Sequence, residues 1–406
     1  MLEFHDALRR VIEAASFLGS EEIALEEATG RALAEDVVTD LDLPPFEATA
    51  MDGWAVRTAD VPSAPAVLSI AGAVGAGSAP HGVLKPGSAL KVMTGASVPE
   101  GADAIVPVED AAPVPQGVEI RVAPRPGAHI RRRGEVFAAG QSLLGAGRRL
   151  APADLVLAAA AGRASLRVAR RACTAVLVTG DEIVPPGSRP GPGQIRNTNG
   201  PLLLGALRRL GAEAANLGVA RDEPHALRGA LSRALSSGLD FLLTTGGVSA
   251  GDYDLVSGIL SGLGAEILFH KVSIRPAKPV LFARAGKTLV FGLPGNPVSA
   301  AVAFDLFVRP AWRKASGLSP ALAQPVVARL LGPVSNRGPR MAFLPAALTL
   351  RNGRLAADPI DSKGSHDVLA HAKASGYLVV SPATSYSSGD EISVYPATEE
   401  TTVGAR

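Results

Sequence analysis

Cysteine is almost absent from this sequence: Cys173 is the single one among 406 residues, which excludes an internal disulfide framework. The seven histidines are scattered, and none pairs with the cysteine at a spacing typical of zinc sites. We therefore expect any bound metal ion to be held by oxygen ligands. The first ten residues include His5, Asp6 and Arg9 and lack the apolar core of a signal peptide. Together with the scarcity of cysteine, this start predicts a cytoplasmic protein.

Long apolar runs and a strong net charge are also missing. No run approaches the roughly 20 apolar residues that a membrane-spanning helix needs, so we expect no membrane association. The formal net charge is only +2, which gives no global indication of nucleic-acid binding. The chain instead has 47% apolar residues, enough for buried cores, together with 44 glycines and 32 prolines. This composition indicates folded domains with many turns, and the length favours two to four domains.

The two ends of the chain show different patterns. Apolar residues at helical spacing predict a helix over residues 4–18, ended by Gly19. A proline-rich break at residues 43–46 predicts a hinge, because proline fixes its own backbone and restricts the residue before it. Short apolar runs between Gly/Pro turns predict mostly β structure for residues 46–132, and similar runs over 318–396 predict a small β-barrel or sandwich.

The middle of the chain alternates predicted strands and helices. In order, these are 174–178 (strand), 202–210 (helix), 212–220 (strand), 223–236 (helix, capped by Asp222), 239–243 (strand), 255–263 (helix) and 267–274 (strand). Such alternation predicts a mostly parallel sheet covered by helices on both faces. Ligands of such sheets bind beyond the carboxyl ends of the strands.

Two strand ends of this sheet carry notable motifs. The first is Thr179-Gly180-Asp181-Glu182, and the second runs from Thr244 to Asp254 and includes Gly246, Gly247 and Gly251. A strand, a Gly-rich turn and a helix together direct unpaired N–H groups and a positive helix end toward one place, which suits a phosphate. Asp252 and Asp254 add carboxylates that suit a hard cation such as Mg²⁺. For the glycines alone, an ordinary strand-to-helix loop is the alternative interpretation.

Two further segments concentrate positive charge. Lys271, Arg275 and Lys278 precede a Pro/Gly-rich turn at residues 292–297, where they would either offset phosphate charge or form an ordinary basic surface. The run Arg131-Arg132-Arg133 would either be a solvated face or grip phosphate or molybdate, since guanidinium groups match such anions.

Seven motifs in one order cover nearly the whole chain. They are Ala-Met-Asp-Gly-Trp-Ala-Val (50–56), Met-Thr-Gly-Ala-x-Val-Pro-x-Gly-Ala-Asp-Ala (93–104), Arg-Arg-Arg-Gly-Glu (131–135), Thr-Gly-Asp-Glu (179–182), Gly-Gln-Ile-Arg-Asn-Thr-Asn (193–199), Thr-Gly-Gly-Val-Ser-x-Gly-Asp-Tyr-Asp (245–254) and Gly-Leu-Pro-Gly-Asn-Pro (292–297). This combination resembles the molybdopterin molybdenumtransferase family, which includes MoeA and the E-domain of gephyrin.

The resemblance implies a multidomain fold of α/β and β parts. It comprises a central α/β unit of the molybdopterin-binding type with a mostly parallel sheet, an elongated β-rich domain, a helical and linker domain, and a C-terminal β-barrel. The domain ranges that we assign on this basis are 1–45 with 133–171 (helical and linker), 46–132 (β-rich), 172–317 (α/β) and 318–406 (β-barrel).

The resemblance also implies a reaction and partners. The implied enzyme takes adenylylated molybdopterin and molybdate, inserts molybdenum into the dithiolene and releases AMP in the presence of Mg²⁺. The implied assembly is a homodimer with its active site near the dimer interface. A molybdopterin adenylyltransferase and apo-molybdoenzymes are the implied protein partners, and no nucleic acid is involved.

The matching motifs assign three groups of site residues. The catalytic candidates are Asp52, Thr94, Glu182, Asp222 and Asp252. The candidates for binding the pterin, nucleotide or molybdate are Thr179, Gly180, Gly246, Gly247, Ser249, Lys271, Arg275, Lys278, Pro294, Pro297, Arg131, Arg340 and Ser365. The candidate Mg²⁺ ligands are Asp181, Glu182 and Asp252.

Three positions depart from the family pattern. Val136 stands where Asp usually follows Arg-Arg-Arg-Gly-Glu, which removes a carboxylate from that loop. Asn197 replaces a common Asp but keeps hydrogen-bonding capacity, and Arg275 replaces a frequent Lys but keeps the charge. Two alternatives therefore remain: a molybdopterin adenylyltransferase, which shares the α/β unit, and a non-catalytic scaffold that binds molybdopterin or a partner protein.

Overall fold

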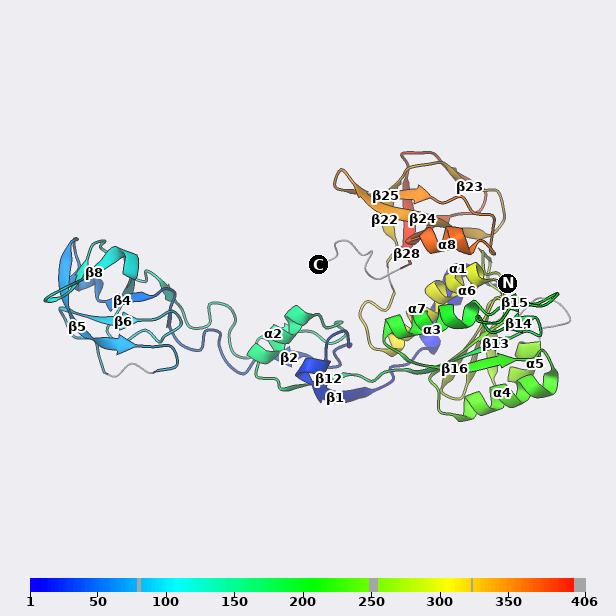
Figure 1. Cartoon of the computed structure of the whole chain (residues 1–406), viewed down its shortest axis with the longest axis horizontal. Coiled ribbons are helices and arrows are strands. Elements are labelled where there is room, and N and C mark those ends of the chain that lie inside the picture. Colours follow the sequence, from blue (N-terminus) through cyan, green and yellow to red (C-terminus); the bar gives the residue numbers. More distant parts are fainter. Residues whose placement is uncertain (79–81, 248–254, 323, 398–406) are drawn as a thin grey trace.

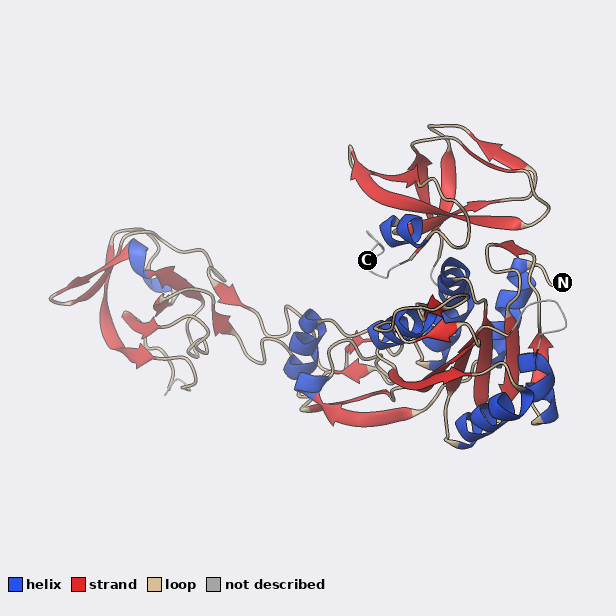
Figure 2. Cartoon of the chain, turned by 45° about the vertical axis from the view of Figure 1, so that its right-hand side comes forward, coloured by secondary structure: helices blue, strands red, loops and turns tan. Residues whose placement is uncertain are grey.

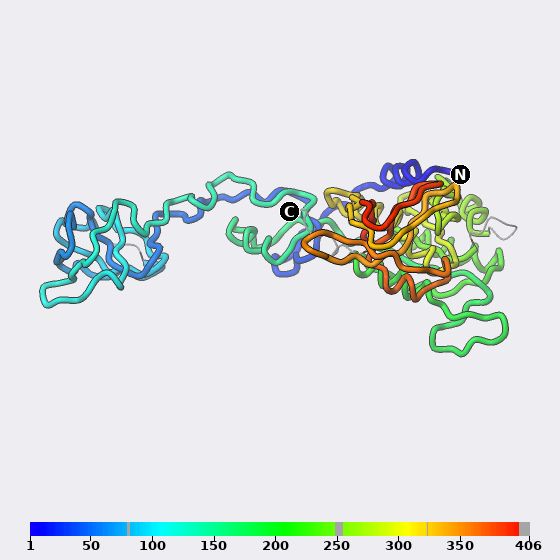
Figure 3. Tube along the Cα trace, turned by 90° about the horizontal axis from the view of Figure 1, so that it is seen from above, coloured from blue at the N-terminus to red at the C-terminus, as the bar shows by residue number. Residues whose placement is uncertain are grey.

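The computed structural model describes residues 1–78, 82–247, 255–322 and 324–397, and the chain is elongated (Figure 1). A β-rich part, from β3 (Ala48–Thr49) to β10 (Ile130–Arg131), lies at one end. The α/β unit and the C-terminal strands lie together at the other end. A smaller part with α2 (Pro152–Ala160) lies between them, and the view from above shows the same separation (Figure 3). The expected multidomain fold is confirmed.

A six-stranded sheet forms the centre of the α/β unit. Its strands, in spatial order, are β16 (Glu213–Ala220), β13 (Cys173–Thr179), β17 (Phe241–Thr245), β21 (Thr288–Leu293), β20 (Leu281–Ala285) and β18 (Glu266–Phe269). The first four strands pair in parallel, whereas β20 is antiparallel to both of its neighbours. The predicted mostly parallel sheet is therefore confirmed.

Helices cover both faces of this sheet (Figure 2). They are α3 (Asn199–Leu210), α4 (Pro224–Ser236), α5 (Leu255–Gly262), α6 (Pro297–Ala303) and α7 (Arg309–Ala315), with a π-helical turn, Phe304–Val308, between the last two. Side chains alternate between faces along β13, so Val176 packs with α3 and α6 while Leu177 packs with α4 and α5. The sheet therefore has a separate hydrophobic core on each of its two faces.

The first helix, α1 (Phe4–Ala14), joins the α/β unit to the C-terminal strands. Phe4 is 1% exposed, and its ring lies 6.0 Å from Phe307, 5.0 Å from Phe343 and 6.0 Å from Tyr395 between centroids. Phe343 and Tyr395 belong to C-terminal strands, whereas Phe307 belongs to the α/β unit. One aromatic cluster therefore holds the two parts together.

The C-terminal strands close into a five-stranded barrel, as predicted. In ring order they are β24 (Met341–Arg351), β25 (Arg354–Pro359), β22 (Val326–Leu330), β28 (Glu391–Pro396) and β26 (Gly376–Val380), and β26 pairs back with β24. A short strand of the preceding unit, β19 (Ile274–Arg275), pairs in parallel with β24. Because of this shared pairing, the barrel is fixed against the α/β unit.

The β-rich part has a sheet and a core of its own. Its strands, in spatial order, are β7 (Ala104–Pro107), β4 (Gly53–Val56), β6 (Ser88–Val92), β5 (Ala66–Val74), β9 (Gly117–Ile120) and β8 (Ala111–Val114). Gly53 is required in β4, since a Cβ atom there would lie 2.2 Å from the carbonyl oxygen of Val106. Trp54 and Val106 belong to the buried core of this part.

The two connections to the β-rich part run side by side as a ribbon. Leu43 forms a bridge with Phe137, and the carboxylate of Asp42 accepts hydrogen bonds from Ala139 N at 2.8 Å and from Arg133 Nε at 2.5 Å. The Ala139 amide, and then Arg133, lower the pKa of Asp42. The expected hinge at residues 43–46 is thus braced by the neighbouring segment, residues 133–139.

Three predicted boundaries were wrong. The first helix ends at Ala14 instead of residue 18, because Ala15 is extended. Asp222 does not cap α4, whose N-cap is Glu223 and whose first residue is Pro224. The predicted strand 267–274 is interrupted and forms β18 and β19 in two different sheets.

No described helix combines the length and hydropathy that crossing a membrane requires.

A buried ion pair ties the linker part to the central sheet. Asp240, 4% exposed, accepts hydrogen bonds from Arg170 Nη1 at 2.8 Å and Nη2 at 2.7 Å, and from Cys173 N at 2.8 Å. Burial alone raises the pKa of Asp240, but the hydrogen bonds from Arg170 and Cys173 outweigh it, so the net shift is downward. Arg170 Nε also donates to Leu18 O at 2.8 Å, so the pair joins three segments.

We predict that Asp240→Asn lowers the free energy of unfolding by about 1–3 kcal/mol at pH 7, because Arg170 loses its charged acceptor. The lowered pKa gives stability that is complete above the unfolded carboxyl value of about 3.9 and is lost as pH falls through the folded value. Thermal unfolding from pH 7 to pH 3 should therefore show the gap to wild type shrinking in acid. Asp6→Asn, in the exposed pair with Arg9, is the control and should change little. A gap that stays constant down to pH 3 would contradict the assignment.

Candidate functional site

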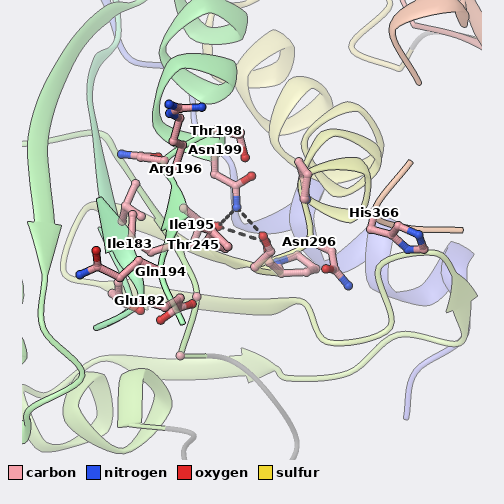
Figure 4. A pocket seen from close by; sticks show the side chains of 18 of the residues that line it. Glu182, Ile183, Gln194, Ile195, Arg196, Thr198, Asn199, Thr245, Asn296 and His366 are labelled. Carbon is pink, nitrogen blue, oxygen red and sulfur yellow. Dashed lines mark hydrogen bonds between the residues drawn. The ribbon is translucent and has the colours of Figure 1, made fainter. Parts of the chain in front are cut away.

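A cavity of about 810 Å³ lies beyond the carboxyl ends of β13, β17 and β21 (Figure 4). This is the sheet edge at which the sequence predicts ligand binding. Its lining consists of Val178, Thr179, Glu182, Ile183, Pro190, residues 194–199, residues 245–247, Pro279, residues 294–297 and His366. The predicted Thr179, Glu182, Gly246, Gly247, Pro294 and Pro297 are thus brought together.

The first two strand ends are in direct backbone contact. A Cβ atom on Gly246 would lie 2.3 Å from the carbonyl oxygen of Thr179, and φ of Gly246 is +92°. Gly247 also has a positive φ, +63°, and a Cβ atom there would lie 2.9 Å from Val256. Any other residue at 246 would force the two turns apart, so glycine is required here for packing as well as for backbone conformation.

Two helices begin at the cavity. The first residues of α3 and α6, Asn199 and Pro297, both belong to its lining. Asn197 Oδ1 accepts a hydrogen bond from Gly200 N at 2.9 Å, so Asn197 keeps the hydrogen-bonding role expected at this position. The starts of helices carry free N–H groups and partial positive charge, which favours an anionic ligand such as a phosphate.

A buried hydrogen-bond network joins the second and third strand ends. Asn199 Nδ2 donates to Thr245 Oγ1 at 2.7 Å and to Gly295 O at 2.8 Å, while Thr245 Oγ1 donates to Pro294 O at 3.1 Å (Figure 4). Asn199 is 6% exposed and Thr245 is 1% exposed. The network holds the turn at residues 294–297 against the end of β17.

Three carboxylates lie on the β13 side of the site. Glu182 lines the cavity, and Asp222 N donates to Asp181 Oδ1 at 3.4 Å. Burial raises the pKa of Asp222; the Thr179 hydroxyl opposes this shift, and the charges of Glu182 and Asp181 add to it. Carboxylates crowded in this way suit a hard cation, since it would relieve their repulsion and bind through oxygen.

The expected metal set is described only in part. Asp181 and Glu182 are described, whereas Asp252, the third predicted ligand, lies outside the described residues. The same holds for Ser249, Gly251 and Asp254. Across the described ranges, no group of three or more His, Cys, Asp or Glu side chains is placed to hold a metal ion.

The C-terminal barrel contributes to the rim of the cavity in the same chain. His366 lines it, and Asn296 Nδ2 donates to Ser365 Oγ at 3.0 Å. The loop holding Ser365 and His366 is positioned by Asp367, which caps α8 (Val368–Lys373) by accepting from Ala370 N at 3.1 Å. Ser365, one of the predicted binding residues, therefore lies beside the site.

The predicted basic residues lie outside the cavity lining. Pro279 is the lining residue of the segment that carries Lys271, Arg275 and Lys278. Arg340 Nη1 donates to Ile274 O at 3.0 Å, which fixes this segment to the barrel. Lys271, Arg275 and Lys278 therefore lie in the segment that reaches the rim, and Arg340 contacts this segment. None of these four residues lines the cavity.

Asp52, Thr94 and Arg131 belong to the β-rich part, at the opposite end of the chain from the cavity (Figure 1). Asp52 Oδ1 accepts from Thr94 N at 2.7 Å and from Thr94 Oγ1 at 2.8 Å. The amide and then the hydroxyl of Thr94 lower the pKa of Asp52. The structure therefore pairs two predicted catalytic residues but does not bring them to the cavity of their own chain.

Val136 lies in the connecting ribbon and is 63% exposed. Its N–H donates to Leu43 O at 2.9 Å, a contact that any side chain at 136 permits. The absence of a carboxylate here therefore leaves the ribbon intact, and within one chain it does not alter the cavity lining.

Among the lining residues that were not predicted as site residues are Asn199, Thr245, Asn296 and His366. Asn199 and Asn296 lie in the motifs 193–199 and 292–297, and Thr245 ends a strand, so their positions carried a usable signal. His366 carried none, because only the packing of the barrel on the α/β unit brings it to the rim.

Three protein-family models match the chain in succession. Residues 2–162 match the MoeA N-terminal region (domain I and II), residues 175–314 match a probable molybdopterin binding domain, and residues 327–397 match the MoeA C-terminal region (domain IV). The N-terminal and C-terminal matches flank the α/β unit on both sides.

Curated relatives and a solved structure are similar over most of the chain. A molybdopterin molybdenumtransferase of Bacillus subtilis is 33% identical, over 97% of this chain and 94% of that protein. One of Synechococcus elongatus is 41% identical, over 72% of this chain and 75% of that protein. The crystal structure of a molybdopterin biosynthesis MoeA protein from Pyrococcus horikosii superimposes with a TM-score of 0.84 at 33% identity, covering 98% of this chain and 99% of that one.

We predict that Gly246→Ala disrupts the cavity, because its Cβ atom would collide with the backbone of Thr179 at a positive φ. The backbone strain alone should cost about 1–3 kcal/mol, seen as a lower thermal unfolding midpoint. Gly258→Ala, on the exposed side of α5 with nothing within 4 Å, is the matched control and should be neutral or stabilising. Equal effects of the two substitutions would contradict the close contact.

Proposed function

The chain belongs to the molybdopterin molybdenumtransferase family, and we propose that it takes adenylylated molybdopterin and molybdate, inserts molybdenum into the dithiolene and releases AMP in a Mg²⁺-dependent reaction. It is an enzyme of molybdenum cofactor biosynthesis. The observation that carries this proposal is the cavity where three parallel strands end, two helices begin and Gly246 meets Thr179.

The cavity suits an anionic, ring-bearing substrate. Part of its lining is the backbone of Gly246 and Gly247, where the absence of side chains lets a phosphate approach closely. Apolar side chains, among them Ile183 and Ile195, supply walls against which a flat ring can lie. Glu182 is the acidic residue of the lining, at the side where the other two carboxylates lie.

Mg²⁺ would be held by Asp181 and Glu182, with Asp252 as the third ligand. Bound there, it would neutralise phosphate charge and make the phosphorus of the adenylate more electrophilic. Asp222 would orient the phosphate of the adenylate from the adjacent turn. Lys271, Arg275 and Lys278 would offset the charge of the pterin or nucleotide phosphates from the rim segment.

Molybdate would enter from the barrel side. Ser365 hydrogen-bonds to Asn296 of the lining, so an oxyanion at this side would meet a hydroxyl, while Arg340, which contacts the rim segment, would add positive charge nearby. Arg131 of the β-rich part would add a further cation if a second chain brings that part to this cavity.

A homodimer would complete the site. Asp52 and Thr94 lie far from the cavity of their own chain, at the end of a braced ribbon that cannot fold back without breaking its contacts. A two-fold partner would bring its own Asp52 to the cavity, because an isologous dimer exchanges equivalent surfaces. A molybdopterin adenylyltransferase would supply the substrate, apo-molybdoenzymes would receive the product, and the setting would be the cytoplasm.

The two alternatives are weaker. The α/β unit alone would suit an adenylyltransferase, but the matched N-terminal and C-terminal regions flank it. A non-catalytic scaffold is favoured only by Val136, whose side chain lies away from the cavity and whose substitution for Asp leaves the lining unchanged. A Val136→Asp variant that gains turnover from an inactive wild type would support the scaffold.

Reconstitution tests the reaction. Purified protein with adenylylated molybdopterin, Mg²⁺ and molybdate should release AMP and activate an apo-molybdoenzyme. Glu182→Gln should slow molybdate-dependent AMP release by at least about 10–100-fold, since it removes a metal-binding carboxylate without changing shape. Glu213→Gln, on the exposed edge strand β16, is the control and should leave the rate unchanged. Binding without molybdate-dependent AMP release in the wild type would refute the proposed reaction.

Subunit mixing tests the shared site. Asp52→Ala and Glu182→Ala should each be inactive, but random mixing of the two should restore about a quarter of wild-type activity, because half of the dimers then hold one intact site of two. The measurement is AMP release after the two variants are unfolded and refolded together. No recovery after verified subunit exchange would mean that each chain supplies its own complete site.

A further inference from the structure

Asn296 stands at the N-cap of α6 but does not cap the helix with its side chain. Asparagine is preferred at this position because its side-chain oxygen normally accepts a hydrogen bond from a backbone N–H of the first turn. In α6 the side chain of Asn296 forms no such bond. Asn296 is exposed and belongs to the cavity lining. Its carboxamide is therefore available for a different partner.

That partner is Ser365 of the C-terminal barrel. Asn296 Nδ2 donates to Ser365 Oγ at 3.0 Å. Figure 4 shows Asn296 on the side of the pocket where His366, the neighbour of Ser365, also lies. Asn296 and His366 both line the cavity, and Ser365 is partly exposed. The bond thus joins the α/β unit to the barrel at the rim, where a ligand can reach it.

The direction of this bond leaves the Ser365 proton unused. A serine hydroxyl has one proton to donate and can accept a hydrogen bond at the same time. Ser365 Oγ accepts from Asn296, and its own O–H donates to no residue in the part of the chain that the structure describes. Ser365 is therefore in the state that is needed to donate a hydrogen bond to an oxyanion.

The loop that carries Ser365 is held by a second set of bonds. The Asp367 carboxylate accepts from Lys363 N at 3.0 Å and from Ala370 N at 3.1 Å, so it ties together the residues before and after Ser365. These bonds fix the backbone of the loop and do not involve the serine hydroxyl. Within the described ranges, the hydroxyl itself is fixed by its contact with Asn296.

We propose that Asn296 is a positioning residue for molybdate: it holds the Ser365 hydroxyl as an acceptor, which leaves the serine proton free to donate to the oxyanion. The inference rests on the proposed function, in which molybdate meets this hydroxyl. Asn296 acts through Ser365 and not by its own contact with molybdate. Without Asn296 the hydroxyl would rotate freely and would lose more conformational entropy when it binds the anion.

A double-mutant cycle tests this role by steady-state kinetics of molybdate-dependent AMP release. The full-length proteins are the wild type, Asn296→Ala, Ser365→Ala and the double variant. Asn296→Ala removes the contact with Ser365 without uncapping α6, since Asn296 makes no cap bond. Ser362→Ala is the control, because it removes hydrogen bonds to Gly364 in the same loop and leaves the Asn296 contact in place.

The expected result is a non-additive effect on the KM for molybdate. Asn296→Ala should raise this KM about 3–10-fold and change kcat less than about twofold, as expected for a lost binding interaction. Ser365→Ala should raise it at least as much. The double variant should match Ser365→Ala within about twofold, because Asn296 then has no hydroxyl to position. Ser362→Ala should change the KM less than about twofold, and all variants should bind AMP as the wild type does.

Asn296→Asp gives a second readout of the serine proton. A carboxylate at position 296 can only accept, so it would draw the Ser365 proton toward itself and away from the anion. The same substitution in the Ser365→Ala background measures the effect of the added negative charge alone. Asn296→Asp should therefore raise the KM for molybdate by a larger factor when Ser365 is present than when it is absent.

Three results would overturn the inference while the proposed reaction stands. The first is an unchanged KM for molybdate in either single variant. The second is additive effects of Asn296→Ala and Ser365→Ala, which would show that the two side chains act independently. The third is an equal effect of Ser362→Ala, which would show that any loosening of the loop is sufficient. If the wild type releases no AMP in response to molybdate, the proposed function fails first and the inference falls with it.

Discussion

The contact between Gly246 and the carbonyl oxygen of Thr179 is the constraint on which the site depends. It brings the ends of β13 and β17 closer than any side chain at 246 would permit. With the turn after β21 tied on by Asn199, three strand ends form one continuous wall. The helices that begin there, α3 and α6, then direct their N-terminal ends at the same cavity. The phosphate site that we propose at this edge depends on this close packing of the backbone.

The rest of the molecule places other groups relative to this wall. The aromatic cluster around Phe4 and the pairing of β19 with β24 hold the barrel so that Ser365 and His366 reach the rim. The ribbon braced by Asp42 has the opposite effect and keeps the β-rich part away. One chain therefore holds the cavity and, far from it, the hydrogen-bonded pair Asp52 and Thr94. In the proposed homodimer, a second copy of the chain would bring its Asp52 and Thr94 to this cavity.

The sequence predicted most of the architecture because the relevant signals are local. The apolar run ending at Thr179 and the glycines at 246 and 247 identified the sheet and its ligand edge. Contacts between distant segments were not predictable in this way. Asn199 acquires its role only when Gly295 lies beside it, and His366 reaches the rim only through barrel packing. The basic residues Lys271, Arg275 and Lys278 were expected at the ligand because charge is visible in sequence. Whether their side chains line the cavity depends instead on how the folded segments pack.

The most direct test of this account is a crystal structure of the protein with adenylylated molybdopterin bound and molybdate withheld. We expect electron density for the ligand in the cavity at the ends of β13, β17 and β21, with phosphate near the start of α3. Density elsewhere, such as the smaller cavity between α3 and the C-terminal barrel, would contradict the central claim that this sheet edge is the active site.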